Sequence, residues 1–331
     1  MTVTVARLRP ALRLWAAAVL GLLPLLFPPA AAAQDYPNRI INMVVPFPPG
    51  GGTDIVGRLI ANAMGDLLPV KVVVVNNPGA AGVVGTRNVL NAKPDGYTLL
   101  FTSQSIVTQS FETKGEVSHR NFLLLGMLNQ DAFGLAVAQK ARWNTLEEFL
   151  AEARRNPGKL NIGTTGFGSA TYMQLPLLER AAGVKFNPIP YPGSAGFHTA
   201  VISGVVDASG VVVGDAASLL KSGQIRLLGV MSPKRLEEFP NVPSYRELGI
   251  NVDFIFWRGL FVHKDTPPAV VKVLRDATAR VAASPVFRDA MAKGSFIPAS
   301  VVSEAETQAF VDREERLVQE VLADLKGAPA K

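Results

Sequence analysis

The sequence contains no cysteine among its 331 residues. This absence excludes disulfide bonds, a thiol nucleophile, cysteine-ligated metals and a lipoprotein anchor. Histidine is nearly as scarce, because only His119, His198 and His263 occur, and they lie far apart in the chain. Protein metal sites draw on clustered histidines and carboxylates. The sequence therefore predicts no metal site and no cofactor.

Catalytic motifs are missing as well. Neither H-E-x-x-H nor G-x-S-x-G occurs, and Gly193-Ser194-Ala195-Gly196 is one residue short of a nucleophile elbow, so we interpret it as a turn. A secreted α/β hydrolase that uses Ser169 or Ser194 is the alternative in the enzyme class. No histidine is placed to serve as the base that such a serine needs. We therefore do not expect an enzyme.

Long apolar stretches are confined to the N-terminus. Arg7, Arg9 and Arg13 form a basic region, Leu14–Phe27 is apolar but interrupted by glycine and proline, and Ala31–Ala33 offers a cleavage site. This pattern predicts a secretory signal peptide over residues 1–33, and an uncleaved anchor is the alternative. The apolar part is too short for a membrane span. An exported chain without cysteine fits a Gram-negative periplasm.

Charge of one sign is not concentrated in the mature chain. The leader holds three arginines and no acidic residue, so its removal leaves 298 residues and lowers the net charge from +6 to +3. This balance gives no reason to expect a nucleic-acid partner. The length of the mature chain predicts two lobes rather than a single hydrophobic core.

Apolar stretches typical of buried strands alternate with amphipathic helical stretches, which predicts an α/β fold with parallel strands and helices on both faces. Phe133–Gln139 and Phe254–Val262 are interpreted as strands that cross between the lobes. We accordingly place the first lobe at residues 34–133 plus 257–331, and the second lobe at residues 134–256.

The segment Asn42–Asp54 contains the most specific local pattern. An apolar strand leads through prolines and three glycines to Thr53 and Asp54, where a helix begins. Free N–H groups and the helix dipole at such a terminus favour an anion. No lysine follows, which rules out a nucleotide-binding P-loop. Thr53 and Asp54 are ambiguous between helix capping and ligand contact.

A second strand, Lys159–Gly163, leads into Thr164–Ser169, a loop of glycines and hydroxyls before another helix. We interpret the two loops as opposing jaws of an anion clamp, with simple tight turns as the alternative. Ser103 follows a third strand at the edge where open α/β sheets bind ligands. Asp207 is predicted to end another strand and is as ambiguous as Asp54.

Six segments in this order resemble one known family. They are PFPPGGGTD, NNPGAAGVVGT, KPDGYTLLF, GKLNIGTTGFGSA, FPNVPSYRELG and WRGLFVHKDTPP, and the resemblance covers the chain from Tyr36 to the last helix. The chain resembles the Bug/TctC family, the extracytoplasmic solute receptors of tripartite tricarboxylate transporters.

The resemblance implies a two-lobed periplasmic binding protein of type II with Venus-flytrap closure, each lobe a mostly parallel sheet flanked by helices. Such a protein binds a small organic acid, a di- or tricarboxylate or a related carboxylate, and delivers it to membrane permease subunits. A monomer is expected. Signalling to a membrane sensor is an alternative output that the sequence leaves open.

The resemblance also implies ligand contacts through backbone amides, hydroxyls and bridging waters, without an arginine. Carried onto this chain, the contacts are Phe47, Gly50, Gly51, Thr53 and Asp54 in the first loop, Thr164, Gly166 and Ser169 in the second, and Ser103, Tyr191 and Asp207 as neighbours. The chain departs from the family pattern at Pro48, where a small residue is common, and in the second loop, where Thr164 and Thr165 replace serine or alanine.

Overall fold

The computed structural model describes residues 36–252 and 254–327. The expected leader at residues 1–33 lies outside the described residues. Contacts divide the chain into residues 1–38 and a unit of residues 39–331, and every element named below belongs to the second unit.

The first sheet has the strand order β2-β1-β3-β9-β4, with β10 also paired to β4. Its strands are β1 (Ile41–Val45), β2 (Val72–Asn76), β3 (Thr98–Ser103), β9 (Ile255–His263), β10 (Pro298–Val301) and the first part of β4 (Phe122–Ala138). β1 runs parallel to β2 and β3, whereas β9 is antiparallel to β3 and β4. The predicted parallel strands are therefore joined by antiparallel crossing strands in a mixed sheet.

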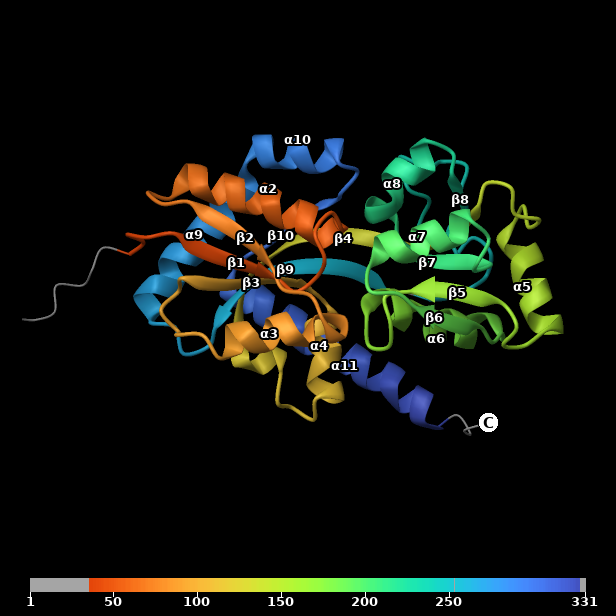
Figure 1. Cartoon of the computed structure of the whole chain (residues 1–331), viewed down its shortest axis with the longest axis horizontal. Helices are drawn as coiled ribbons and strands as arrows, with labels where there is room; N and C mark the ends of the chain where they lie inside the picture. The colour runs from red at the N-terminus through yellow and green to blue at the C-terminus, as the bar shows by residue number, and fades with distance from the viewer. Residues whose placement is uncertain (1–35, 253, 328–331) are drawn as a thin grey trace, which may run out of the picture. The chain divides into compact units, whose positions relative to one another are not determined.

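The second sheet repeats this plan. β5 (Asn161–Thr164) lies parallel to β6 (Asn187–Pro190) and β7 (Ala208–Val212). The end of β4 runs antiparallel to β7 and to β8 (Ile225–Met231). Figure 1 shows β4 and β9 extending from the first sheet toward the second.

A single strand, β4, belongs to both sheets. Residues 122–132 pair with β9, and residues 133–138 pair with β7 and β8. The sequence predicted only the second of these parts, Phe133–Gln139, as a crossing strand. The polar Asn129, Gln130 and Asp131 interrupt the apolar pattern just before it, which concealed the first part. The lobe boundaries given above remain a prediction.

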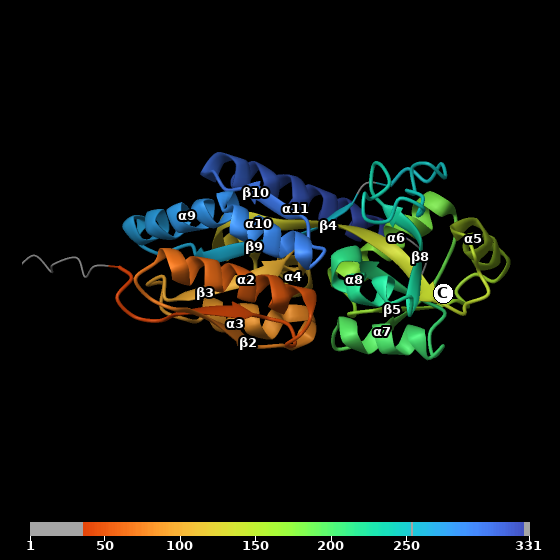
Figure 2. The ribbon, with the colours of Figure 1, turned by 90° about the horizontal axis from the view of Figure 1, so that it is seen from above.

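Helices cover both sheets (Figures 1 and 2). They are α2 (Gly52–Leu67), α3 (Val83–Leu90), α4 (Ser105–Glu112), α5 (Leu146–Arg155), α6 (Ala170–Ala182), α7 (Ser194–Ile202), α8 (Val213–Lys221), α9 (Pro268–Ala283), α10 (Pro285–Lys293) and α11 (Glu304–Gly327), with short 3₁₀ turns at Ala80–Gly82 and His119–Asn121. α2 packs on β1, β2, α9 and α10, whereas α7 packs on β5 and β7. α11 contacts β4, α4 and α6. No helix in the described ranges combines the length and apolarity that a membrane crossing requires.

Local sequence signals explain several helix starts. The Thr145 and Ser303 side chains accept hydrogen bonds from Glu148 N and Glu306 N and so cap the starts of α5 and α11. α9 begins at Pro268, and proline suits the first position of a helix. Trp143 and Trp257 are both buried in the core.

Candidate functional site

A cavity of about 90 Å³ lies where elements of both sheets meet. The first sheet supplies the β1–α2 loop, the end of β3, the start of α4 and one side chain of β9. The second sheet supplies the β5–α6 segment and the starts of α7 and α8. The lining residues are Phe47, Pro48, Pro49, Gly51, Gly52, Thr53, Ser103, Ser105, Thr165, Ala170, Thr171, Gly193, Ser194, Ala195, Phe197, Val212, Asp215 and Phe256. We call this space the central cavity.

The β1–α2 loop forms one wall of the central cavity. Gly50 adopts φ +77°, a conformation that favours glycine, and α2 begins at Gly52 without a side-chain cap. The first N–H groups of α2 are therefore free of a capping side chain at the wall of the cavity. Across from the loop, Ser194 Oγ lies 3.7 Å from where a Cβ of Gly51 would be. The two sheets thus approach each other closely here.

Asp54 stabilises this loop and does not line the cavity. Its Oδ2 accepts hydrogen bonds from Gly50 N at 2.9 Å and Arg58 Nε at 3.0 Å, and its Oδ1 accepts one from Asn76 Nδ2 at 2.9 Å. Burial acts to raise the pKa of Asp54, but the bonds from Arg58, Gly50 and Asn76 outweigh it and hold that pKa below its ordinary value. In this structure Asp54 therefore fixes the loop from behind.

Ser103 lines the central cavity. Its hydroxyl is 3.0 Å from that of Ser105, the first residue of α4, and both side chains are buried. The sequence analysis did not propose Ser105 as a contact. The pair presents two adjacent hydroxyls to the cavity.

The second predicted jaw lies just behind the cavity wall. The Thr164 hydroxyl accepts from Gly166 N at 3.3 Å, and the Ser169 hydroxyl donates to Gly166 O at 2.7 Å. These three residues do not line the central cavity, whereas Thr165 and Thr171 do. The hydroxyls of Thr165 and Thr171 are 2.7 Å apart. The loop of Thr164, Gly166 and Ser169 thus supports the neighbouring threonine pair.

The two remaining predicted neighbours lie apart from the central cavity. Tyr191 N donates to Thr164 O at 2.8 Å, and Tyr191 lines an adjacent cavity of about 560 Å³ that shares Phe47, Pro48 and Thr165. Asp207 Oδ2 accepts from Asn161 N at 2.8 Å. Asp207 therefore joins β5 to the start of β7 and makes no contact with either cavity.

The segment Gly193–Ala195, interpreted from sequence as a turn, opens α7 at the cavity wall. Its N-cap, Gly193, makes no side-chain cap hydrogen bond. A Cβ on Gly193 would lie 3.3 Å from Pro48 Cγ, so the first loop packs directly against this helix start. The cavity therefore has a second uncapped helix terminus, which sequence reasoning had placed at Thr164–Ser169.

His198 lies one helical turn after Ser194, but no hydrogen bond joins the two within the described part of the chain. Burial lowers the pKa of His198 to about 4, with Asp215 opposing that effect, and its Nε2 has no described partner. The serine–base contact that a hydrolase requires is not formed.

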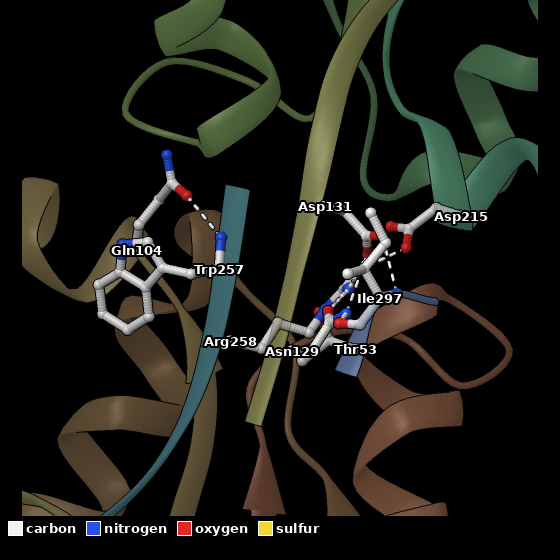
Figure 3. Close-up of polar contacts among 8 residues, drawn as sticks. All are labelled: Thr53, Gln104, Asn129, Asp131, Asp215, Trp257, Arg258 and Ile297. Carbon is white, nitrogen blue, oxygen red and sulfur yellow. Dashed lines mark hydrogen bonds and ion pairs between the residues drawn. The ribbon is translucent and has the colours of Figure 1, made fainter. Parts of the chain in front are cut away.

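Arg258 joins the two sheets beside the cavity (Figure 3). This β9 residue is fully buried, and its guanidinium donates to Thr53 Oγ1 at 3.1 Å, to Asn129 Oδ1, and to Asp215 Oδ1 at 2.5 Å. Asp131 Oδ2 lies 3.4 Å from Nη1. Sequence reasoning missed this group. The available signal was a single arginine inside the apolar stretch of Phe254–Val262.

Burial raises the pKa of Asp131 to about 7, an effect that Arg258 opposes and Asp215 reinforces. A buried guanidinium stays charged, and two facing carboxylates compensate it. Among the described residues, no group of three histidines or carboxylates is arranged to hold a metal ion.

Asp215 comes from α8 and reaches across to the first residue of α2. A Cβ on Gly52 would lie 1.7 Å from Asp215 Oδ1, so only glycine leaves room for this carboxylate. In a second contact of this kind, the first sheet supplies the acidic side chain and the second sheet the glycine. A Cβ on Gly168 would lie 1.6 Å from Glu112 Oε1. Glu112 ends α4, and Gly168 belongs to the segment after β5. Each glycine loop therefore packs against an acidic side chain of the other sheet.

Comparison with known proteins agrees with this geometry. Residues 56–323 match the model of the tripartite tricarboxylate transporter family receptor, TctC. A UPF0065 protein encoded in the gbd 5' region of Cupriavidus necator is 33% identical over 289 residues, which is 86% of each chain.

Solved structures are similar over nearly their whole length. The periplasmic binding protein BugD has a TM-score of 0.80 at 28% identity, with 87% of this chain and 98% of BugD covered. A malate-bound MatC from Rhodopseudomonas palustris has a TM-score of 0.80 at 26% identity (86% and 99% covered), and an adipate-bound protein of R. palustris has 0.82 at 25% (88% and 98% covered). The chain therefore belongs to the TctC family of periplasmic solute receptors and has their two-lobed α/β fold.

Proposed function

We propose that this protein binds a small organic acid in the central cavity and delivers it to the permease subunits of a tripartite tricarboxylate transporter. The observation that carries the proposal is a cavity lined by two uncapped helix starts and by hydroxyl groups, drawn from both sheets. Relatives whose structures contain malate and adipate support a carboxylate ligand.

The energetics require both sides of the cavity. A charge at one helix N-terminus contributes roughly 0.3–1 kcal/mol when exposed and about 2 kcal/mol when partly buried. Micromolar affinity corresponds to about 8 kcal/mol. Two helix starts and several charge-assisted hydrogen bonds, closed around a ligand that has lost its water, supply the difference. Binding is therefore coupled to lobe closure in this proposal.

Among the predicted contacts, we propose that Phe47, Gly51, Thr53 and Ser103 touch the ligand, because they line the cavity. Gly50 and Asp54 hold the first loop in place through their hydrogen bond, and Thr164, Gly166 and Ser169 support the neighbouring threonine pair of the second sheet. Pro48 and Pro49 also line the cavity, so the proline-rich loop narrows the space as well as stiffening it. The proposal includes export through a cleaved leader at residues 1–33 and a monomeric mature protein.

Thermal unfolding of the mature protein against a panel of mono-, di- and tricarboxylic acids tests ligand binding. The protein is first unfolded and refolded to remove any ligand retained from the host. An acid at about 100 times its dissociation constant is expected to stabilise the fold by roughly 2.7 kcal/mol. If no organic acid raises the melting temperature of the stripped protein, the proposal is wrong. Acid uptake by vesicles that contain the permease then tests delivery.

A further inference from the structure

The wall of the central cavity carries charge of one sign. Of its lining residues, all within the described part of the chain, Asp215 is the single ionisable one. The other polar groups are the hydroxyls of serines and threonines and the backbone of the loops. No lysine, arginine or histidine lines the space, so a ligand with two carboxylates would find one acidic side chain and no cationic one.

Asp215 lies beside the first jaw. Its Oδ1 lies where a Cβ of Gly52 would be, next to the first residue of α2. A carboxylate of the protein itself therefore lies close to one of the two helix starts. The start of α7 has no such occupant, because Gly193, Ser194 and Ala195 line the cavity directly.

The positive charge of Arg258 is not available to the ligand either. Its guanidinium is 0% exposed and is shared between Asp215 Oδ1 at 2.5 Å and Asp131 Oδ2 at 3.4 Å. The bond to Arg258 engages only one oxygen of Asp215, and no hydrogen bond reaches Oδ2 from the described residues. The Asp215 side chain is 13% exposed. A carboxyl group with one acceptor oxygen that no described residue engages thus remains on the cavity wall.

We propose that Asp215 is a specificity-determining residue, which selects small acids that carry an ammonium or hydroxyl donor in addition to one carboxylate. The donor binds Asp215, and the carboxylate lies toward the start of α7 and the hydroxyls of Ser103 and Ser105. A second carboxylate in place of the donor is disfavoured by repulsion from Asp215. This inference rests on the proposed function and names the ligand class for the same site.

Matched linear acids test the inference with wild-type protein. Acids of three to five carbons that end in methyl, hydroxyl, ammonium or a second carboxylate are compared by isothermal titration calorimetry at pH 7.5. Hydroxyl- or ammonium-terminated acids are expected to bind roughly tenfold or more tightly than the dicarboxylate of the same length, as a charge-assisted hydrogen bond replaces a like-charge contact. Equal or tighter binding of the dicarboxylates would overturn the role of Asp215.

The Asp215→Asn variant tests the residue itself. Asparagine keeps an oxygen for Arg258 and replaces the charge with an amide that donates. The variant is expected to lose affinity for the ammonium acids roughly tenfold and to gain affinity for the dicarboxylates. Asp276→Asn is the matched control, since Asp276 pairs with Lys272 on the exposed face of α9, and it should leave the ranking unchanged.

The outcomes separate the two proposals. Binding of acids with an unchanged ranking in Asp215→Asn overturns the inference and leaves the proposed function in place. Failure of every acid to bind wild-type protein overturns the proposed function and the inference with it. Should the variant not fold, the wild-type ranking of donor acids against dicarboxylates decides the question alone.

Discussion

At the scale of single residues, Glu112 is the least satisfied acidic side chain of the described structure. Its Oε1 is buried without a hydrogen-bond partner and packs closely against Gly168 of the other sheet. Burial raises the pKa of Glu112 to about 7. Between pH 4.5, the ordinary pKa of a glutamate, and pH about 7, the Glu112 carboxyl is therefore protonated in the folded protein and ionised in the unfolded chain. Stability from this group is present at low pH and is lost as pH rises through about 7.

Replacement of Glu112 by glutamine should remove that loss. We expect Glu112→Gln to raise the free energy of unfolding at pH 8 by about 1–2 kcal/mol, a value reduced from the full pKa shift because the side chain is only partly buried. At pH 4, where the wild-type carboxyl is protonated in both states, the difference should vanish. Urea unfolding at the two pH values measures it.

Glu116→Gln serves as the control, because Glu116 is 72% exposed and pairs with Arg87 at the surface. It should change stability little at either pH. A Glu112→Gln effect of the same size at pH 4 and pH 8 would contradict the assignment of the titrating group.

At the scale of elements, two of the three glycines of α2 are there for different reasons. Gly52 faces Asp215 Oδ1 and Arg258 Nη2, which would lie 1.7 and 2.6 Å from a Cβ. Gly65, in the last turn, has nothing closer than 3.8 Å. The first glycine permits the contact between the sheets, whereas the second only lowers the helix propensity.

Alanine at the two positions should act in opposite directions. We expect Gly52→Ala to displace Asp215, to destabilise the fold by about 1–3 kcal/mol and to weaken ligand binding. Gly65→Ala should stabilise the fold by roughly 0.5–1 kcal/mol through helix propensity and leave binding unchanged. Chemical unfolding and ligand titration of both variants measure this. Equal effects of the two substitutions would show that Gly52 has no role in sheet contact.

Local patterns made many elements predictable. The apolar β-branched residues of β1 and β2, the glycine loop before α2 and the capping residues Thr145 and Ser303 are recognisable because their causes lie within a few residues of chain. The family resemblance implied Phe47, Gly51, Thr53 and Ser103 as ligand contacts, and all four line the central cavity.

The rest of the site depends on contacts between distant segments. Arg258 meets Asp215 only because β9 and α8 come together, and no spacing within either segment indicates the pair. Ser194 was interpreted as part of a turn because its segment is one residue short of a nucleophile elbow, yet it begins α7 and its Oγ lies close to Gly51. The family resemblance implied binding without an arginine and gave no reason to connect Arg258 with the site.

At the scale of the whole molecule, Arg258 is the side chain that ties the two sheets together. It reaches Thr53 on α2, Asn129 and Asp131 on β4, and Asp215 on α8. Lysine keeps the charge but has neither the planar fork nor the number of donors. A single substitution therefore disconnects several elements at once.

We expect Arg258→Lys to lower the free energy of unfolding by about 3–5 kcal/mol, because buried acceptors and at least one buried carboxylate lose their partner. Arg235→Lys is the matched control, since Arg235 forms an exposed ion pair with Glu247. This substitution should change the free energy of unfolding by less than about 1 kcal/mol. Denaturant unfolding of both variants provides the comparison. Similar losses in the two would mean that Arg258 is not the link between the sheets.

The strand β4 also sets the order in which the chain can fold. The second part of β4 pairs with β7 and β8, and both of these strands have been synthesised once the chain reaches Met231. The first part pairs with β9, which is synthesised only when the chain reaches His263. During synthesis the first sheet therefore lacks the strand between β3 and β4 until most of the chain exists. Pairings between such distant segments make folding slow. In the proposed export through a membrane, this delay keeps the chain unfolded for longer and so favours its translocation.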